Sequence, residues 1–348
     1  MFTFQITDFR NLETFECTVN RGIQWLIGDN GAGKTAILES IYYLSRGRSF
    51  RERKLNRLIR HGRKQSNVSI NFGDHRITML LNASGSNRQD RFGDPISMTE
   101  VMTVLPVFYL GPSIGHLITG PPSYRRRLLD WVAFHVKRSH WRDLNRLKTA
   151  LKQRNSLLRQ QSPRAVIEAF DHSLITLSND VSATRKHVVD LLRQQTIKLC
   201  SNDDECLHFE FRPGYSSDSL QETLETAIDT DLSRGYTTLG PHRADVSIGL
   251  TSQPKGHFSG GQIKMVAIEA SLAALRAIGS VSNQPLLLID DLDAELSAGN
   301  VELALDAIRT HSAYNLATTL GKIGSTQPTD TTFHVKRQSA STDIINPY

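Results

Sequence analysis

The residues with the clearest chemical potential lie in a glycine-rich segment near the amino terminus. It reads Gly28-Asp29-Asn30-Gly31-Ala32-Gly33-Lys34-Thr35 and fits the pattern G-x-x-x-x-G-K-[ST] at every defined position. The glycines allow a tight turn whose backbone N–H groups point at an anion. We expect Asn30, Gly31, Gly33, Lys34 and Thr35 to bind the phosphates of ATP. Lys34 would act as a point charge, and Thr35 would also be a ligand of Mg²⁺.

The flanking sequence supports this phosphate-binding loop. Residues 22–27 form an apolar, strand-like run that ends at the loop, and residues 36–44 leave it with helical periodicity. Strand, loop and helix are the order that such a loop requires. A chance glycine-rich turn is the alternative, and it would have no need of either flank.

Two carboxylates follow a second apolar run late in the chain. Residues 286–289 are four consecutive apolar residues, which predicts a strand buried on both faces, and Asp290 and Asp291 stand where it emerges. The pattern is that of a Walker B strand. We expect Asp290 to hold Mg²⁺, directly or through water, and Asp291 to be the catalytic residue that orients or activates the attacking water.

A third motif precedes a helical run at residues 263–278. It reads Phe258-Ser259-Gly260-Gly261-Gln262 and resembles the signature sequence of ABC-type ATPases. The Ser259 side chain and the amides of Gly260 and Gly261 can hold a γ-phosphate at a helix N-terminus. We therefore add Ser259, Gly260, Gly261 and Gln262 to the expected nucleotide-binding residues, although a plain loop before a helix has the same pattern.

Charge is unevenly distributed along the chain. The net charge is +6, but residues 46–64 contain nine Lys or Arg against one acid, and residues 131–164 repeat that ratio. A stretch with five acids and no basic residue spans 218–231. Charge runs usually mark solvated faces, but two basic runs in a nucleotide-binding protein favour a polyanionic partner. The expected DNA-binding residues are Arg46, Arg48, Arg51, Arg53, Lys54 and Arg57.

Composition describes an ordinary folded protein. Hydrophobic residues make up 39% and charged residues 22% of 348, which is long enough for two domains. No apolar run approaches the ~20 residues of a membrane helix, and the amino terminus lacks a signal peptide's regions. We expect a cytoplasmic protein without a membrane partner. Cys17, Cys200 and Cys206 lack a paired C-x-x-C, so neither a disulfide framework nor a zinc site is indicated.

Apolar periodicity predicts an α/β fold with an inserted all-helical arm. The three motifs resemble those of ABC-type ATPases, and this resemblance implies that the α/β part is an ABC-type P-loop ATPase head. The elements expected in the head are strands within 2–19 with a break at 8–11, a hairpin of 68–72 and 76–81, a polar loop at 82–95, a strand at 101–110, and a strand at 207–211 followed by an acidic helix to about 232.

The section from Tyr124 to about Leu199 contains no glycine and one proline, and its periodicity is helical. Ser162-Pro163 predicts the reversal of an antiparallel helical hairpin. A coiled-coil-like seam on its second helix comprises Ile167, Phe170, Leu174, Leu177, Val181, Thr184, Val188 and Leu191. We expect a helical arm domain at 123–199 inserted into a discontinuous head of 1–122 and 200–348.

Further segments resemble the RecF family, bacterial recombination and gap-repair ATPases related to the SMC and Rad50 heads. They cover most of the chain: Phe9-Arg10-Asn11, Leu38-Glu39-Ser40-Ile41, the Gly120 to Asp130 segment that resembles G-x-P-x-x-R-R-R-x-L-D, Gly240-Pro241-His242-Arg243, and Leu286 to Leu296. The chain departs from the family pattern at Ser113-Ile114, Ala244 and Gly299-Asn300, and at Ser297, where the family has Asp.

The resemblance implies an ATP- and DNA-binding recombinational repair protein with weak ATPase activity. Such a protein forms an ATP-dependent homodimer in which the signature of one subunit closes on the P-loop of the other. It binds DNA at gaps and single-strand/double-strand junctions and, with RecO and RecR, helps to load the recombinase RecA. The residues themselves indicate only nucleotide and polyanion binding.

Two other functions remain open on the residues. The ATPase subunit of an ABC transporter would carry similar motifs, but it would co-purify with a membrane partner. A structural or defence ATPase of the SMC type would normally have far longer helical arms.

Overall fold

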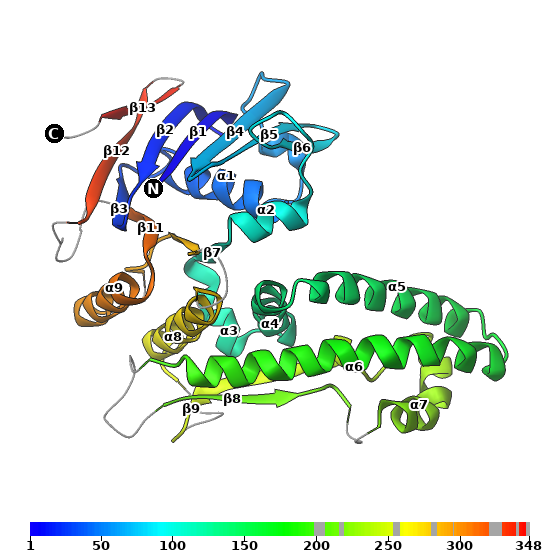
Figure 1. The fold of residues 1–348 in the computed structure, drawn as a ribbon. Coiled ribbons are helices and arrows are strands. Elements are labelled where there is room, and N and C mark those ends of the chain that lie inside the picture. Colours follow the sequence, from blue (N-terminus) through cyan, green and yellow to red (C-terminus); the bar gives the residue numbers. More distant parts are fainter. Residues whose placement is uncertain are drawn as a thin grey trace. The chain divides into compact units, whose positions relative to one another are not determined.

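The computed structural model describes residues 1–197, 206–215, 219–252, 258–279, 284–294, 296–319, 329–338 and 341–345 (Figure 1). The chain divides into two compact units. Unit 1 comprises Met1–Ile114 and Ser282–Tyr348, and unit 2 comprises Gly115–Val281. The division predicted from the sequence, a head of 1–122 and 200–348 with an arm of 123–199, has different boundaries from these two units and stays a prediction.

Unit 1 contains a five-stranded antiparallel sheet in the order β2-β1-β4-β5-β6. Phe2, Phe4 and Ile6 are buried and alternate with more exposed polar residues, the pattern of a half-buried strand. The hairpins expected at 2–19 and around 73–74 are confirmed. The strands are β1 (Phe2–Phe9), β2 (Leu12–Val19), β4 (Gln65–Phe72), β5 (His75–Asn82) and β6 (Gly85–Gln89).

A second, six-stranded sheet of unit 1 has the order β13-β12-β3-β11-β10-β7, and its strands are parallel except for β13. All four residues of β10 are buried, as predicted for a strand covered on both faces. The strands are β3 (Gly22–Ile27), β7 (Val107–Leu110), β10 (Leu286–Ile289), β11 (Tyr314–Thr319), β12 (Thr331–Gln338) and β13 (Ser341–Ile345).

Helix α1 (Lys34–Arg46) contacts strands of both sheets, and its Ile37, Leu38 and Ile41 are fully buried in the shared core. The helix ends at Gly47, whose left-handed conformation lets its N–H donate to the carbonyl of Tyr43 at 2.9 Å. The other helices of unit 1 are α2 (Met98–Val104) and α9 (Ala298–His311), with a 3₁₀ turn at Leu55–Arg57.

Two local predictions in unit 1 were wrong. Part of the polar loop expected at 82–95 is strand β6, which pairs with β5 as a polar edge strand. The strand expected at 101–110 is helix α2 followed by the short strand β7. A capping box between Ser97 and Glu100 starts this helix, and an apolar run that includes both elements resembles one long strand.

Ser297 is the N-cap of α9, and its side chain accepts a 3.4 Å hydrogen bond from the N–H of Asn300. Serine is among the preferred N-cap residues, because its hydroxyl oxygen satisfies an N–H group of the first helical turn.

Unit 2 is largely helical, as expected for 124–199. Helices α5 and α6 pack together and reverse at Ser162-Pro163, so the predicted hairpin is confirmed. The seam faces the core at most positions, but Phe170 is 40% exposed. The elements are α3 (His116–Thr119), α4 (Pro122–Val136), α5 (Ser139–Arg159), α6 (Arg164–Gln194), β8 (Leu207–Arg212), α7 (Leu220–Arg234), β9 (Asp245–Leu250) and α8 (Gly260–Gly279).

Ion pairs join segments of unit 2 that are distant in sequence. Arg125 pairs in a bidentate manner with Asp245 at 2.7 and 3.0 Å. Arg185 does the same with Asp130 at 2.8 and 2.9 Å and also donates to the carbonyl of Pro241 at 2.6 Å. The Arg-Arg-Arg and Gly-Pro-His-Arg segments thus belong to one packed framework. No helix in the described ranges is both long and apolar enough to span a membrane.

Candidate functional site

The glycine-rich loop lies between the end of β3 and the start of α1, which is the order predicted. Gly31 and Gly33 have φ angles of +79° and +116°, which side-chain-bearing residues rarely adopt. A Cβ on Gly33 would also lie 2.6 Å from a methyl group of Leu12. Asn11 donates to the carbonyl of Gly31 at 3.0 Å and fixes the loop from outside. The loop therefore has a backbone conformation and a close approach to Leu12 that glycine permits at Gly33.

Lys34 folds over this loop. Its ammonium group donates to the carbonyls of Gly28 and Asp29, the latter at 3.0 Å, and the residue is buried. Burial lowers the pKa of Lys34, and the nearby carboxylates of Asp291, Asp29 and Asp290 oppose that shift. Its hydrogen bonds go to carbonyl oxygens of the loop, and a buried cation in such a position favours a nearby anion.

Asp290 is the centre of a cluster of hydroxyl groups. Its Oδ1 atom accepts hydrogen bonds from Thr35 at 3.1 Å and from Thr318 at 2.8 Å, and its Oδ2 atom accepts one from Tyr109 at 3.1 Å. The residue is 5% exposed. The sheet sets the positions of these groups. Strand β10, which leads into Asp290, lies between β7, which carries Tyr109, and β11, which carries Thr318. Thr35 and Asp290, predicted to share a metal ion, are in direct contact.

Asp291 has a strained backbone with φ of +49°. Its N–H donates to the hydroxyl oxygen of Thr318 at 3.2 Å, so the hydroxyl that bonds Asp290 also holds the following residue. Strained residues that surrounding structure holds in place cluster at functional sites. The prediction that Asp291 is the catalytic carboxylate stays a prediction, and its position beside Asp290 suits that role.

These residues fit a phosphate chain and Mg²⁺. The narrow loop and Lys34 provide donors and positive charge for phosphates, and Thr35 and Asp290 provide the oxygen ligands that Mg²⁺ prefers. Among the described residues no group of three His, Cys, Asp or Glu side chains could hold a metal. A magnesium ion here would therefore depend on phosphate and water oxygens as well as on the protein, which is its usual behaviour at nucleotides.

The signature residues begin α8 in unit 2. Ser259 and Gln262 cap the helix reciprocally: the N–H of Ser259 donates to Gln262 Oε1 at 2.9 Å, and the N–H of Gln262 donates to Ser259 Oγ at 3.4 Å. Both residues are exposed. The N–H groups of Gly260 and Gly261 make no hydrogen bond to a described residue, and nothing described lies within 4 Å of the Cβ position of Gly260. This helix end can therefore accept an outside ligand.

The six basic residues of the first run differ in their surroundings. Arg48, Arg53 and Lys54 are exposed and form no side-chain hydrogen bond or ion pair with described residues. Arg51 pairs with the buried Glu39 at 3.1 Å, and Arg57 pairs with Glu52 at 3.3 Å. Arg46 is half-buried, and burial lowers its pKa. The first three are the residues best placed to contact phosphates.

The second basic run contains a residue that cannot contact DNA. Arg154 is fully buried and bonds Asp171 at 2.7 Å, Asp231 at 2.6 Å and the hydroxyl of Thr237 at 2.9 Å. Phosphate contacts from the basic helix 137–164 stay a prediction, and the buried Arg154 is not available for one. Helical periodicity places one of several basic residues in the interior, and the sequence does not show which one.

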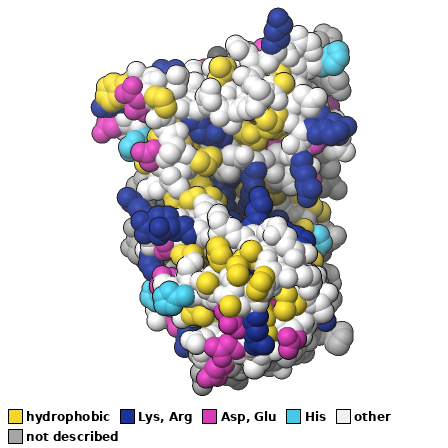
Figure 2. Space-filling view, turned by 90° about the vertical axis from the view of Figure 1, so that its right-hand side faces the viewer, with side chains coloured by type: hydrophobic (Ala, Val, Ile, Leu, Met, Phe, Trp, Pro, Cys, Tyr) yellow, Lys and Arg dark blue, Asp and Glu magenta, His cyan; other side chains and the backbone are white. Residues whose placement is uncertain are grey.

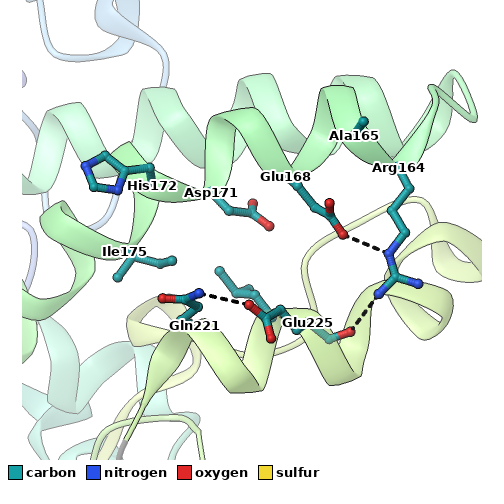
Figure 3. Close-up of a pocket in the computed structure, with 9 residues that line it drawn as sticks. Arg164, Ala165, Glu168, Asp171, His172, Ile175, Gln221 and Glu225 are labelled. Carbon is teal, nitrogen blue, oxygen red and sulfur yellow. Dashed lines mark hydrogen bonds and ion pairs between the residues drawn. The ribbon is translucent and has the colours of Figure 1, made fainter.

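Acidic side chains gather at the lower end of the face shown in Figure 2, whereas Lys and Arg cluster elsewhere on it. In unit 2, a pocket of about 730 Å³ lies between α6 and α7 (Figure 3). Glu168, Asp171 and Glu225 line it, with Arg164 paired to Glu168 at 2.8 Å. No residue of the three nucleotide motifs lines this pocket.

Two groups of site residues were not predicted. Tyr109 and Thr318 bond Asp290, but a tyrosine or threonine on a strand carries no signal of that contact. Arg10 and Glu39 form a bidentate ion pair at 2.8 and 2.7 Å beneath the basic run. Both belong to segments that resemble the RecF family, so the resemblance marked these residues without showing what they do.

Solved structures with this fold carry the same class of head. A structure of the recombination mediator protein RecF-ATPrS in the RecFOR pathway matches with a TM-score of 0.85 and 22% identity, over 99% of this chain and 97% of that chain. A SmcHead bound to the C-winged helix domain of ScpA matches with a TM-score of 0.62 and 14% identity, over 99% and 97%. The fold is that of an ABC-type ATPase head of the RecF and SMC class.

Sequence relatives narrow this class. The RecF/RecN/SMC N terminal domain family matches residues 1–103. DNA replication and repair protein RecF of Edwardsiella ictaluri is 34% identical, over 88% of this chain and 89% of its own. The RecF protein of Stenotrophomonas maltophilia is 32% identical, over 90% and 87%. The chain belongs to the RecF family.

Proposed function

We propose that this chain binds ATP and Mg²⁺, dimerises around the nucleotide and holds DNA at gaps and single-strand/double-strand junctions during recombinational repair. The observation that carries the proposal is the direct contact of Thr35 with Asp290 beside the glycine-rich loop. The names of the relatives support a role in replication and repair, and a structure of RecF-ATP in the RecFOR pathway supports nucleotide binding. Cooperation with RecO and RecR in loading RecA is part of this proposal.

Each motif has a separate task in this scheme. Asn30, Gly31, Gly33, Lys34 and Thr35 hold the phosphates, and Thr35 and Asp290 hold Mg²⁺, which neutralises phosphate charge. Asp291 orients or activates water. Ser259, Gly260, Gly261 and Gln262 of one subunit meet the nucleotide held by the other. Their exposed helix end supports this task, because the N–H groups at a helix N-terminus suit a γ-phosphate.

Slow hydrolysis would then limit the lifetime of the dimer and of its hold on DNA. The exposed Arg48, Arg53 and Lys54 supply phosphate contacts that do not depend on base identity. Membership of the RecF family favours this repair function over the transporter and SMC-type alternatives. A cytoplasmic location is part of the proposal.

The test is a set of four titrations on the wild-type chain, in which a labelled gapped duplex and a labelled blunt duplex are each measured with and without Mg²⁺ and ATPγS. We expect tighter binding with the nucleotide and preference for the gapped over the blunt duplex. Equal affinities in all four combinations would contradict the proposal.

A further inference from the structure

An aromatic cluster in unit 1 lies between the carboxylate of Asp290 and the first basic run. Tyr109 donates its hydroxyl to Asp290 Oδ2 at 3.1 Å, and its ring stacks on Phe50 with centroids 3.8 Å apart and planes 10° apart. Tyr42 packs edge-on against both rings, at 5.4 Å from Phe50 and 5.9 Å from Tyr109. Such aromatic contacts stabilise the arrangement beyond the area that they bury.

Phe50 belongs to the segment that presents the exposed basic residues. On either side of it, Ser49 and Arg51 bond the fully buried Glu39, the first through its hydroxyl and the second through a 3.1 Å ion pair. Arg10 holds the same carboxylate in a bidentate pair. The beginning of the basic segment is therefore fixed by a buried charge and by the stack on Tyr109.

The end of the segment is fixed by the same arginine. Arg10 donates from its side chain to the carbonyl of Arg57 at 2.9 Å, and its N–H donates to the carbonyl of Leu58 at 2.8 Å. Residues 48–57 are thus held at both ends, with Arg53 and Lys54 exposed between them. Whatever shifts the first anchor also shifts the residues that are free to contact phosphates.

Tyr109 is placed to transmit such a shift. The Tyr109 hydroxyl donates to Oδ2 of Asp290, whereas Thr35 donates to Oδ1 of the same carboxylate. A divalent cation held by this carboxylate would draw electron density from it and so weaken Oδ2 as the acceptor of the tyrosine bond. The strength of the tyrosine bond therefore depends on whether the site is filled.

We propose that Tyr109 is a positioning residue that links nucleotide and Mg²⁺ at Asp290 to the basic segment 48–57 through its stack on Phe50. This inference rests on the proposed function and adds a route by which the nucleotide controls the polyanion-binding residues. Linkage requires the effect to be reciprocal: a polyanion on the segment changes nucleotide affinity by the same factor.

The experiment is hydrogen exchange of the full chain with and without Mg²⁺ and ATPγS. Several amides of the segment are hydrogen-bonded, among them those of Arg53 and Lys54, which donate to Glu52 Oε1 at 2.8 and 2.9 Å, so their exchange reports local opening. In the wild type we expect nucleotide to slow exchange at residues 28–35 and to change exchange at residues 48–57 by about fivefold or more. At nucleotide concentrations that fully protect residues 28–35 in each protein, Tyr109→Phe should reduce the change at residues 48–57 to less than about twofold.

Two further variants sharpen the comparison. Tyr314→Phe is the matched control, because it removes a tyrosine hydroxyl from β11 that contacts the amino terminus and not Asp290, and it should behave as the wild type. Phe50→Leu removes the stack but leaves the hydroxyl of Tyr109, and it should also lose the response at 48–57. If Tyr109→Phe fails to fold or to bind nucleotide, Phe50→Leu alone tests whether the stack carries the response.

Hydrogen exchange at the two segments separates a failure of the proposed nucleotide binding from a failure of the proposed role of Tyr109. Unchanged exchange at 28–35 in the wild type would overturn nucleotide binding itself. A response at 28–35 without one at 48–57 in the wild type, or a full response at 48–57 in Tyr109→Phe and Phe50→Leu, would overturn the inference and leave the proposed function standing.

Discussion

The hydroxyl of Thr35 donates a 3.1 Å hydrogen bond to Oδ1 of Asp290, joining residues 255 positions apart. Thr35 lies in the first turn of α1, and Asp290 follows the last residue of β10. The contact joins the glycine-rich loop to the end of a fully buried strand. Oxygen ligands from two rigid elements provide a defined position for Mg²⁺ beside a phosphate-binding loop.

Lys34→Ala should weaken ATP binding by about 10- to 100-fold, since a charge-assisted hydrogen bond contributes about 1.5–3 kcal/mol. The fold should survive, because Lys34 bonds loop carbonyls and lies outside the apolar core. Fluorescence titration with an ATP analogue and circular dichroism check both points. Lys54→Ala, at an exposed lysine, is the matched control, and unchanged affinity in Lys34→Ala would refute the phosphate-binding assignment.

Asp291→Asn should keep ATP binding and slow turnover by at least about 100-fold, the scale typical of losing a general base. Asparagine tolerates the left-handed backbone of Asp291, so the substitution changes charge with little added strain. Single-turnover hydrolysis measures the effect, with the exposed Asp293→Asn as control. Wild-type turnover in the variant would mean that another group handles the water.

Replacing Arg48, Arg53 and Lys54 together with Ala should weaken binding to all DNA sequences alike. It should reduce the slope of log affinity against log salt by up to about 2.7 per subunit, since each neutralised phosphate contributes about 0.9. Affinity measured over a series of salt concentrations gives the slope. A triple alanine variant of Arg138, Arg142 and Arg146 shows whether the second basic run contributes to DNA binding. Equal salt slopes for the wild type and the first variant would mean that residues 48–54 form a solvated face that does not contact DNA.

Arg154→Met should destabilise the protein by about 3 kcal/mol near neutral pH, because Asp171 and Asp231 would remain as buried carboxylates without their cation. Burial already raises the pKa of Asp171. Without the arginine the folded pKa of Asp171 should rise further, so the deficit from this carboxylate is complete above that pKa and shrinks as pH falls toward the unfolded value near 3.9.

Urea unfolding of this variant at pH 7 and pH 4.5 measures the deficit. Arg146→Met is the control on the same helix, because Arg146 is exposed. A deficit that is absent at pH 7, or that grows on acidification, would contradict the assigned charge states.

The sequence predicted the elements whose pattern is local and strong. The glycine-rich loop, strand β10 and the reversal between α5 and α6 lie where they were expected. Glycine and proline favour particular backbone conformations, and four consecutive apolar residues mark a buried strand. Helix α2 was missed because apolar side chains in a short run suit either a helix or a strand, and its capping box is a weak signal. Strand β6 was missed because its residues are polar and it is stabilised by pairing with β5.

Partners of individual side chains were harder to predict. The burial of Arg154 and the contact of Tyr109 with Asp290 depend on strands and helices that come together only in the folded chain. No local propensity encodes such contacts. The site residues could be grouped by motif, but the bonds that position them required the tertiary structure.

In the proposed function, nucleotide joins two subunits through the glycine-rich loop of one and the signature of the other. Sedimentation velocity of Asp291→Asn, with and without Mg²⁺ and ATP, measures this dimerisation. We expect a species of twice the chain mass of 39.0 kDa with the nucleotide and a single chain without it, and we expect Ser259→Arg to abolish the larger species while leaving ATP binding intact. A sedimentation coefficient that does not respond to bound ATP would rule out dimerisation around the nucleotide.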